Sequence, residues 1–458
     1  NVGTDLIGKD SFQEVYISGI ASPVAKHTYA VRDIDRLPQT LRAAFEIASS
    51  GRKGPVLVDI PKDLTAAMCD YEPRQAIQPS LAEDPDPAQI RAIAEMIGQS
   101  RRPVICFGGG VVSSGASEEM KQFIEATGIP ACHTIMATGV IAFGDELDLG
   151  MTGMHGSVAA NTAIANADLL IAAGTRLSDR VAQGRKTFAP KARIIQFDID
   201  PSEIGKSVDS GGSLIGDLRA ILRALIPLMK KSDRSEWMAD IHCWKDADYF
   251  PKNPEGKLMP HQIMSAIGDL AGPNSIITTD VGQHQIWAAQ YCKSTRPRGF
   301  MTSGGLGTMG FGYGAAIGAQ VAFPEAPVIH ITGDGSLHMN MCEAATAVSY
   351  GLPIITVIMD NSVLGMVRQL QWAYHKERYM ATEPYRKTDY EMVGKGFGVQ
   401  TYRTATEDAF RDALSEALKN TGPSWIICPI DKKEKVLPMM PTGKGVEDII
   451  LTQEEGGL

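Results

Sequence analysis

Two polar residues that could hold a metal ion, Asp334 and Asn361, each stand just beyond a run of apolar residues. Asp334 is the centre of a Gly-Asp-Gly triplet after Val328–Thr332, and Asn361 closely follows Ile354–Met359. A carboxylate and an amide oxygen are ligands that suit Mg²⁺, and the glycines let backbone amides approach an anion. Either feature alone could be a plain turn or loop start. Together they indicate a magnesium ion that holds a phosphate group.

The same stretch of sequence predicts the strands and the helix that position these two residues. Both apolar runs have the composition of strands buried on both faces, as in a parallel sheet. Between them, Met341–Tyr350 has helical composition and is followed by Gly351-Leu352-Pro353, which stops a helix. A strand–helix–strand unit brings both strand ends to one edge of the sheet, where open α/β folds bind ligands.

This combination of a Gly-Asp-Gly triplet with an asparagine after the next strand resembles the motif of thiamine diphosphate enzymes. The resemblance implies that Asp334, Asn361 and the backbone carbonyl of Val363 are the metal ligands. The diphosphate groups and a water molecule would complete the coordination shell of Mg²⁺.

Two further stretches, VGQHQIWAAQ at 281–290 and GGLGTMGFG at 304–312, resemble acetohydroxyacid synthase, also called acetolactate synthase. In that family pattern Gln283 and His284 approach the diphosphate, and Met309 supports the cofactor in its bent shape. The resemblance also implies cofactor contacts at Gly307, Gly333, Gly335, Ser336 and Met366.

The middle of the chain contains three predicted strands, Val104–Phe107, Leu169–Ala172 and Ile194–Asp198, that end in glycine, arginine or aspartate. Such strand ends make a plausible nucleotide cleft, although the full dinucleotide fingerprint is missing. The stretches LGMTGMHGSVAANTAIANADLLIAAGTRLSDRV and IIQFDIDPSEIGK resemble the FAD-binding domain of the same family. The resemblance implies a structural FAD contacted by the runs 155–176 and 198–217, with His155, Gly156, Gly174, Arg176, Asp198, Asp200 and Asp217 among the contacts. Arg176 would also approach the substrate.

Residues 1–70 contain a predicted amphipathic helix, Leu37–Ser49, and a buried strand, Pro55–Ile60. GKDSFQEV, SPVAKH and GRKGPVLVDIPKDL resemble the later part of the family's pyrimidine-binding domain. The resemblance implies catalytic roles for Gln13 and Lys26 beside Arg176, and a pocket position for Phe12, acting across a dimer interface. No segment matches the part that carries the family's activating glutamate, and the sequence begins at Asn1, so we expect a trimmed chain.

The predicted fold is α/β, with three doubly wound parallel-sheet domains, the first of them truncated. The expected boundaries are 1–70 for the pyrimidine-binding part, 71–87 for a linker, 88–228 for the FAD-binding domain, 229–257 for a connection, 258–430 for the thiamine diphosphate and magnesium domain, and 431–458 for a tail.

Composition limits the function classes. The 458 residues are 44% hydrophobic and 21% charged, as in ordinary globular proteins. A net charge of −9 argues against a nucleic-acid partner, and no apolar run is long enough to span a membrane. Seven cysteines without metal-site spacing indicate reduced thiols in a cytosolic protein.

The family resemblance implies that the protein decarboxylates pyruvate with thiamine diphosphate and joins the product to a second 2-keto acid, pyruvate or 2-ketobutyrate. This is the first common step of branched-chain amino-acid biosynthesis. The family pattern GMVxQWQ reads GMVRQLQ here, so Leu370 replaces a tryptophan that selects the larger substrate. Met154 and Leu370 are the other predicted pocket residues besides Phe12.

Leu370 keeps two related activities open, those of glyoxylate carboligase and sulfoacetaldehyde acetyltransferase. The unmatched glutamate segment motivates a third alternative, a cofactor-binding protein without activity. A site shared between subunits implies a homodimer or homotetramer. The family resemblance also brings in a small regulatory subunit as a partner.

Overall fold

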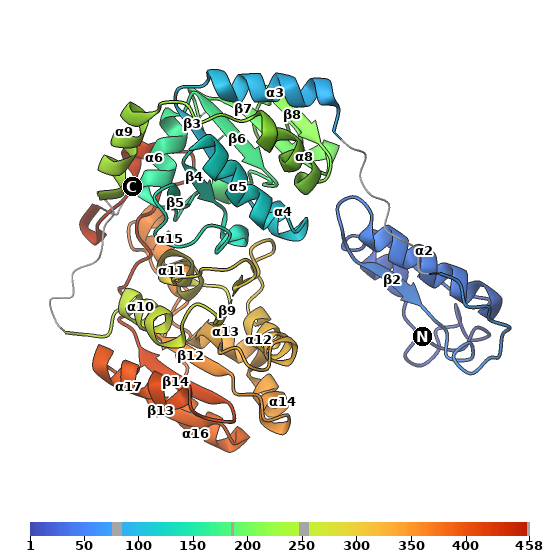
Figure 1. Ribbon diagram of the computed structural model, residues 1–458. Helices are drawn as coiled ribbons and strands as arrows, with labels where there is room; N and C mark the ends of the chain where they lie inside the picture. Colours follow the sequence, from blue (N-terminus) through green and yellow to red (C-terminus); the bar gives the residue numbers. More distant parts are fainter. Residues whose placement is uncertain (76–84, 185–186, 247–255, 456–458) are drawn as a thin grey trace. The chain divides into compact units, whose positions relative to one another are not determined.

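The computed structural model describes residues 1–75, 85–184, 187–246 and 256–455, and its chain divides into two compact units (Figure 1). The first contains residues 1–84 with the short stretches 199–201 and 215–217. The second contains the remainder and includes two six-stranded sheets. The predicted linker at 71–87 falls largely on residues 76–84, which lie outside the described residues.

The first unit is built on two parallel strands, β1 (His27–Ala30) and β2 (Val56–Asp59), with His27 opposite Val56. The helices α1 (Ile17–Ala21) and α2 (Leu37–Ser49) pack beside this pair. The predicted helix and strand of this region are therefore confirmed.

The second unit begins with a sheet in the order β5-β4-β3-β6-β7-β8, in which the paired strands from β5 to β7 are parallel. Its strands are β3 (Pro103–Phe107), β4 (Ala131–His133), β5 (Asp148–Met151), β6 (Leu169–Ala173), β7 (Arg193–Asp198) and β8 (Gly212–Ile215). Its helices are α3 (Pro87–Gln99), α4 (Gly109–Ser113), α5 (Ser117–Thr127), α6 (Val158–Asn166), α7 (Asp179–Ala182), α8 (Leu218–Leu225) and α9 (Ser235–Asp246).

The other sheet has the order β10-β9-β11-β12-β14-β13 and is parallel throughout. Its strands are β9 (Ile276–Thr279), β10 (Phe300–Met301), β11 (Val328–Gly333), β12 (Ile355–Asp360), β13 (Gln400–Arg403) and β14 (Ser424–Pro429). The helices around it are α10 (Pro260–Ala271), α11 (Gln283–Tyr291), α12 (Phe311–Ala322), α13 (Asp334–Asn340), α14 (Ala344–Ser349), α15 (Gly365–His375), α16 (Tyr390–Phe397) and α17 (Glu407–Ala417).

Successive residues of the central strands enter opposite cores, which makes this sheet doubly wound. In β12, Val357 packs with α10, α11 and α17, whereas Ile358 packs with α12, α14 and α16. Both faces are therefore covered by helices, and this explains why these strands read as continuous apolar runs. The predicted α/β fold with parallel sheets is confirmed.

Two elements differ from the sequence-based expectation. A helix was predicted over 341–350, but α13 starts at Asp334 directly after β11, and a 3₁₀ turn over 341–343 separates it from α14. Tertiary contacts outweigh the poor helix propensity of this stretch, since Ser336 Oγ donates to the carbonyl of Val281 at 3.0 Å.

The stretch predicted as a connection, 229–257, contains α9. Trp237 of α9 is buried in the core of the first sheet of this unit, and its Nε1 donates to the carbonyl of Pro103 at 3.1 Å. Residues 247–255 lie outside the described residues. No helix in the described part of the chain is both long and apolar enough to cross a membrane.

Candidate functional site

In both large sheets, successive strands are first added toward one edge and then toward the other. This reversal of strand order lies next to predicted site residues. In the second sheet β10 lies on one side of β9 and β11 on the other, so the reversal falls between β9 and β11. In the first, it falls between β3 and β6. The crevice outside the strand ends at such a reversal is the usual ligand site of open α/β sheets.

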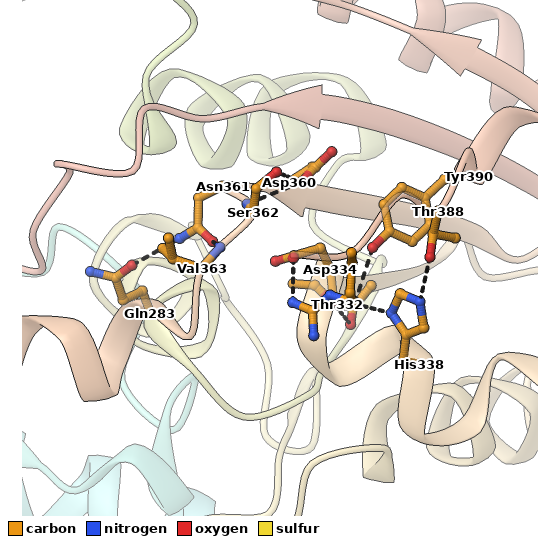
Figure 2. Close-up of polar contacts among 12 residues, drawn as sticks. Gln283, Thr332, Asp334, His338, Asp360, Asn361, Ser362, Val363, Thr388 and Tyr390 are labelled. Atoms are coloured by element: carbon orange, nitrogen blue, oxygen red, sulfur yellow. Dashed lines mark hydrogen bonds and ion pairs between the residues drawn. The ribbon is translucent and has the colours of Figure 1, made fainter. Parts of the chain in front are cut away.

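Asp334 begins α13 at the end of β11 and is only 3% exposed. Its Oδ2 accepts a hydrogen bond from Arg386 Nη2 at 2.6 Å. Burial raises the pKa of the Asp334 carboxyl above its ordinary value, although Arg386 opposes the shift. The backbone carbonyl of Asp334 contacts His338 Nδ1 at 2.8 Å and the hydroxyl of Tyr390 at 3.5 Å, which fixes the first turn of α13 (Figure 2).

Asn361 follows the end of β12, the strand that pairs with β11. Its Nδ2 donates to Gln283 Oε1 at 3.2 Å, and its Oδ1 accepts from the backbone amide of Val363 at 3.1 Å (Figure 2). Ser362 has a φ of 56° and donates from both its amide and its hydroxyl to Asp360. These bonds hold the loop 360–363 in a tight turn beside Gln283.

Gln283 lies at the start of α11 and is held from two further sides. Its Nε2 donates to Gln369 Oε1 at 3.0 Å and to the carbonyl of Glu434 at 2.9 Å. A Cβ added at Gly365 would lie 2.0 Å from Gln283 Oε1 and 2.7 Å from Asn361 Nδ2. The glycine at 365 therefore lets the start of α15 approach these two amide side chains closely.

His284 is 5% exposed, and its Nε2 has no hydrogen-bond partner within the described residues. Burial lowers the pKa of His284 to about 4, so the ring is neutral at pH 7. A Cβ at Gly333 would lie 2.9 Å from His284 Nδ1, which places the imidazole against the end of β11. A buried, unpaired ring nitrogen at a strand-end crevice is a group available to a ligand.

Beneath this site lies a buried acid, Asp280, at the end of β9. It accepts hydrogen bonds from the Gly312 amide and from Thr332 Oγ1, both at 2.7 Å, and its Oδ2 lies 3.3 Å from His330 Nε2. Burial raises the pKa of Asp280, but the interactions with His330, Thr332 and Gly312 outweigh burial and hold the pKa well below its ordinary value. The carboxylate therefore connects β9, β11 and α12 through these contacts.

The remaining predicted cofactor contacts lie on neighbouring elements of the same unit. Gly307 has a φ of 66° and Met309 is half-buried, both in the stretch before α12. Met366 lies on α15 and packs against the core that contains α10 and α11. Gly335 and Ser336 lie on α13 beside Asp334.

Of the predicted FAD contacts, Gly174 lies at the other reversal, between β3 and β6. The amide of Gly110 donates to the carbonyl of Gly174 at 2.9 Å, and a Cβ at Gly174, where φ is 58°, would lie 2.8 Å from Gly110 Cα. The ends of β3 and β6 therefore touch through glycines. Asp198 is the last residue of β7 and Asp217 directly precedes α8, whereas Asp200 lies in the turn after β7.

Arg176 and His155 link this sheet to the other one. A Cβ at Gly305, in the glycine-rich stretch before α12, would lie 3.7 Å from Arg176 Nη2. The carbonyl of His155 accepts from Gln290 Nε2 of α11 at 3.0 Å, and burial lowers the pKa of His155 to about 4. At Gly156, a Cβ would lie 2.6 Å from the carbonyl of Met151.

Met154 and Leu370, two of the predicted pocket residues, lie in one hydrophobic cluster. Trp372 belongs to the same cluster and is 4% exposed beneath Leu437 and Met439 of the C-terminal tail. Trp372 is therefore part of the hydrophobic core beneath the tail.

Three predicted residues lie in the N-terminal part of the chain, residues 1–70. Phe12 is 88% exposed, and Gln13, the next residue of the same turn, has a φ of 64°. Lys26 Nζ donates to the carbonyls of Ile47 at 2.5 Å and Ser50 at 2.8 Å, so it caps the C-terminus of α2. The structure gives Lys26 this structural contact, and its role toward a substrate stays a prediction.

Sequence reasoning missed three residues that shape the site: Arg386, Gln369 and Glu434. Each reaches the site from a segment far along the chain. Gln369 stands in the GMVRQLQ stretch, where only Leu370 and Met366 were given roles, and Arg386 and Glu434 belong to no motif that local spacing would single out. Within the described residues, no group of three or more His, Cys, Asp or Glu side chains could hold a metal ion. A metal at Asp334 would therefore depend on amide, carbonyl and ligand oxygens.

Comparisons with known proteins identify two domains of the chain. Residues 280–428 match the family model described as the C-terminal TPP-binding domain of thiamine pyrophosphate enzymes, and residues 90–225 match the model of their central domain. The fold and the site thus define a thiamine diphosphate-dependent enzyme.

Similar proteins with curated names show which family of thiamine diphosphate-dependent enzymes this chain belongs to. The chain is 42% identical to the probable acetolactate synthase large subunit of Methanocaldococcus jannaschii, over 98% of this chain and 78% of the relative. It is 40% identical to the acetolactate synthase large subunit of Parasynechococcus marenigrum, over 96% and 72%, and 39% identical to that of isozyme 2 of Escherichia coli, over 98% and 81%. The chain belongs to the acetolactate synthase large-subunit family.

Proposed function

We propose that this protein acts as an acetolactate synthase, which decarboxylates pyruvate and joins the resulting two-carbon unit to a second 2-keto acid. Thiamine diphosphate supplies the electron sink that the decarboxylation needs. The observation that carries the proposal is the convergence of Asp334, Asn361 and His284 at the reversal between β9 and β11, where Nε2 of His284 has no hydrogen-bond partner within the described residues.

The donor set fits a magnesium ion that anchors a diphosphate. Asp334 offers a carboxylate oxygen, Asn361 an amide oxygen, and Val363 its backbone carbonyl, and oxygen ligands of this kind suit Mg²⁺. Nε2 of His284, which has no hydrogen-bond partner within the described residues, is available to a phosphate oxygen. Both N–H groups of Gln283 already donate to Gln369 and Glu434, so its predicted contact with the diphosphate would require one of these bonds to be exchanged. Gly333 and Gly335 carry no side chain at the start of α13, and their neighbours there include His284 and Arg386.

FAD is proposed for the other reversal, between β3 and β6, where the glycines at 110 and 174 keep the strand ends free of side chains. Arg176 would sit between the flavin and the substrate, since its guanidinium reaches the stretch before α12 in the other part of the unit. Its charge would hold the substrate carboxylate. Residues 1–70 would form part of the pyrimidine-binding domain, with Gln13 near the thiazolium across a dimer interface and Lys26 as a second candidate cation for the substrate carboxylate.

Leu370 favours a second candidate, a related carboligase or acetyltransferase with another acceptor. Trp372 is buried beneath the tail and does not stand in for the family's tryptophan at 370. The substrate pocket would thus be lined by an aliphatic side chain at this position. Parallel assays with pyruvate, glyoxylate and sulfoacetaldehyde separate these activities.

The decisive experiment measures acetolactate formation from pyruvate with and without thiamine diphosphate, Mg²⁺ and FAD. It is paired with calorimetry of thiamine diphosphate binding in the presence of Mg²⁺. The double variant Asp334→Ala/Asn361→Ala should weaken that binding by at least about 100-fold. The matched control is Asp412→Ala, an exposed acid on α17. Equal binding by the double variant and the control would refute the proposed anchoring site.

The words "large subunit" in the names of relatives lead us to propose a small regulatory partner for this chain as well. A homodimer or homotetramer and a cytosolic location complete the proposal. Co-purification with a candidate small subunit, with sizing by light scattering, tests the assembly.

A further inference from the structure

Arg386 makes an ion pair inside the proposed metal site. Its Nη2 lies 2.6 Å from Asp334 Oδ2, and the side chains are 22% and 4% exposed. Asp334 is the single carboxylate of the proposed ligand set, so Arg386 contacts the group on which metal binding most depends. No motif in the sequence pointed to this arginine.

The guanidinium of Arg386 also covers the adjoining backbone. A Cβ added at Gly335 would lie 3.4 Å from Nη2 and 3.7 Å from Nη1, so the planar group lies against the first turn of α13. Its Nε is buried and has no hydrogen-bond partner within the described residues. The arginine therefore occupies space beside Gly335 where the diphosphate is expected.

The Arg386 guanidinium and a metal ion would compete for the negative charge of Asp334. A buried carboxylate needs a counter-charge, and a guanidinium at hydrogen-bond distance provides one. A magnesium ion would bind the same carboxylate at about 2.1 Å. The guanidinium and the ion would then lie within a few ångströms of each other in a buried site, where like charges repel strongly.

The segment that carries Arg386, residues 376–389, has a backbone suited to rearrangement. Lys376, Glu377, Ala381 and Tyr385 have φ values of 49°, 59°, 55° and 51°, a region that residues with a side chain rarely adopt. The segment is tied to the domain by side chains, as in the ion pair of Glu383 with Arg368 at 3.1 Å. The conformation that places Arg386 on Asp334 is thus held by side-chain contacts around a strained backbone.

We propose that Arg386 is a built-in competitor of the divalent cation: it pairs with Asp334 in the cofactor-free protein and must leave when the metal binds. The inference rests on the proposed magnesium site. Its consequence is that the apparent metal affinity is reduced by the fraction of molecules in which the ion pair is closed. Arg386 therefore lowers the apparent affinity for the metal ion, and it is not one of the groups that hold the cofactor.

The test titrates Mn²⁺ into the full chain after removal of cofactors, with free Mn²⁺ followed by electron paramagnetic resonance. Arg386→Gln should tighten the apparent Mn²⁺ dissociation constant by at least about tenfold, since the competing charge is gone. Lys387→Gln removes an equal charge from the exposed neighbouring residue and should change the constant by less than about twofold. Unchanged or weakened binding in Arg386→Gln would overturn the proposal.

Thermal stability supplies a readout other than affinity. Without metal, Arg386→Gln should melt below the wild-type protein, because Asp334 loses its counter-charge. Saturating Mn²⁺ should then raise its melting temperature by more than it raises that of the wild type. A loss of stability that Mn²⁺ does not restore would mean that Arg386 has a structural role alone, and this result would also overturn the proposal.

Asp334→Ala separates this inference from the proposed site. If that variant binds Mn²⁺ as the wild type does, the proposed metal site is wrong. If Asp334→Ala no longer binds Mn²⁺ while Arg386→Gln binds it no more tightly than the wild type, the metal site is right and only the proposed competition by Arg386 is wrong. Should Arg386→Gln fail to fold, a structure of the wild-type protein loaded with Mg²⁺ and thiamine diphosphate decides. The 2.6 Å ion pair should be broken in that structure, and its persistence beside a bound metal would refute the proposal.

Discussion

Replacing Gly365 by alanine tests the packing on which the candidate site depends. The added Cβ would lie 2.0 Å from Gln283 Oε1, far inside van der Waals contact, so Gln283 must move. It is held by hydrogen bonds from its Nε2 to Gln369 and to the carbonyl of Glu434. Relief of the clash therefore requires these bonds to break or α15 to shift.

The magnitude follows from these contacts. Two hydrogen bonds contribute about 1 kcal/mol each, and overpacking of a close-packed site costs about 1–3 kcal/mol. Allowing for partial relaxation, we expect Gly365→Ala to lower the free energy of unfolding by about 3 kcal/mol. For a domain of this size the melting temperature should then fall by about 6–12 °C.

The assay is differential scanning fluorimetry of the cofactor-free protein, followed by calorimetry of thiamine diphosphate binding with Mg²⁺. Gly396→Ala is the matched control, since a Cβ there, in the last turn of α16, meets nothing within 4 Å. Alanine should stabilise that helix by about 0.5–1 kcal/mol. A melting temperature of Gly365→Ala within about 1 °C of the wild type would refute the reasoning, because Gln283 would then be free to move.

Three further predictions concern buried titratable groups and the pocket. The pKa of both His155 and His284 is lowered to about 4 by burial, so the unfolded chain binds more protons below pH 6.5. Stability should therefore fall by about 1.4 kcal/mol per pH unit for each histidine between pH 6 and 4, and melting curves over this range should show a smaller fall for His284→Gln. Asp280→Asn should lower the free energy of unfolding by about 3 kcal/mol at pH 7, measured by thermal melting, because it removes a buried charge that accepts from Gly312 and Thr332 and lies 3.3 Å from His330. Leu370→Trp should raise the ratio of 2-aceto-2-hydroxybutyrate to acetolactate in competition assays with 2-ketobutyrate and pyruvate, and an unchanged ratio would count against a pocket role.

The sequence located the strands well, because a strand buried on both faces must be apolar along its whole length. β3, β6 and β7 each extend the predicted runs Val104–Phe107, Leu169–Ala172 and Ile194–Asp198 by one residue, and β11 and β12 differ from prediction by one residue at their ends. Polar residues directly after such runs could therefore be assigned to one edge of the sheet. The helices after β11 were less predictable, since α13 is held by contacts of Ser336 and His338 that local composition does not encode.

By itself, then, the sequence determined the α/β class, the two strand-end motifs and the family resemblance, because all three reside in local patterns. The tertiary structure decided the strand order, which places the chain reversal between β9 and β11, and the partners of the site residues. Arg386 reaches Asp334 across 52 positions of the chain, and Gln283 reaches the carbonyl of Glu434 across 151. Such pairs depend on how the sheet, α11, α15 and the tail pack together, and no local pattern of residues specifies that packing.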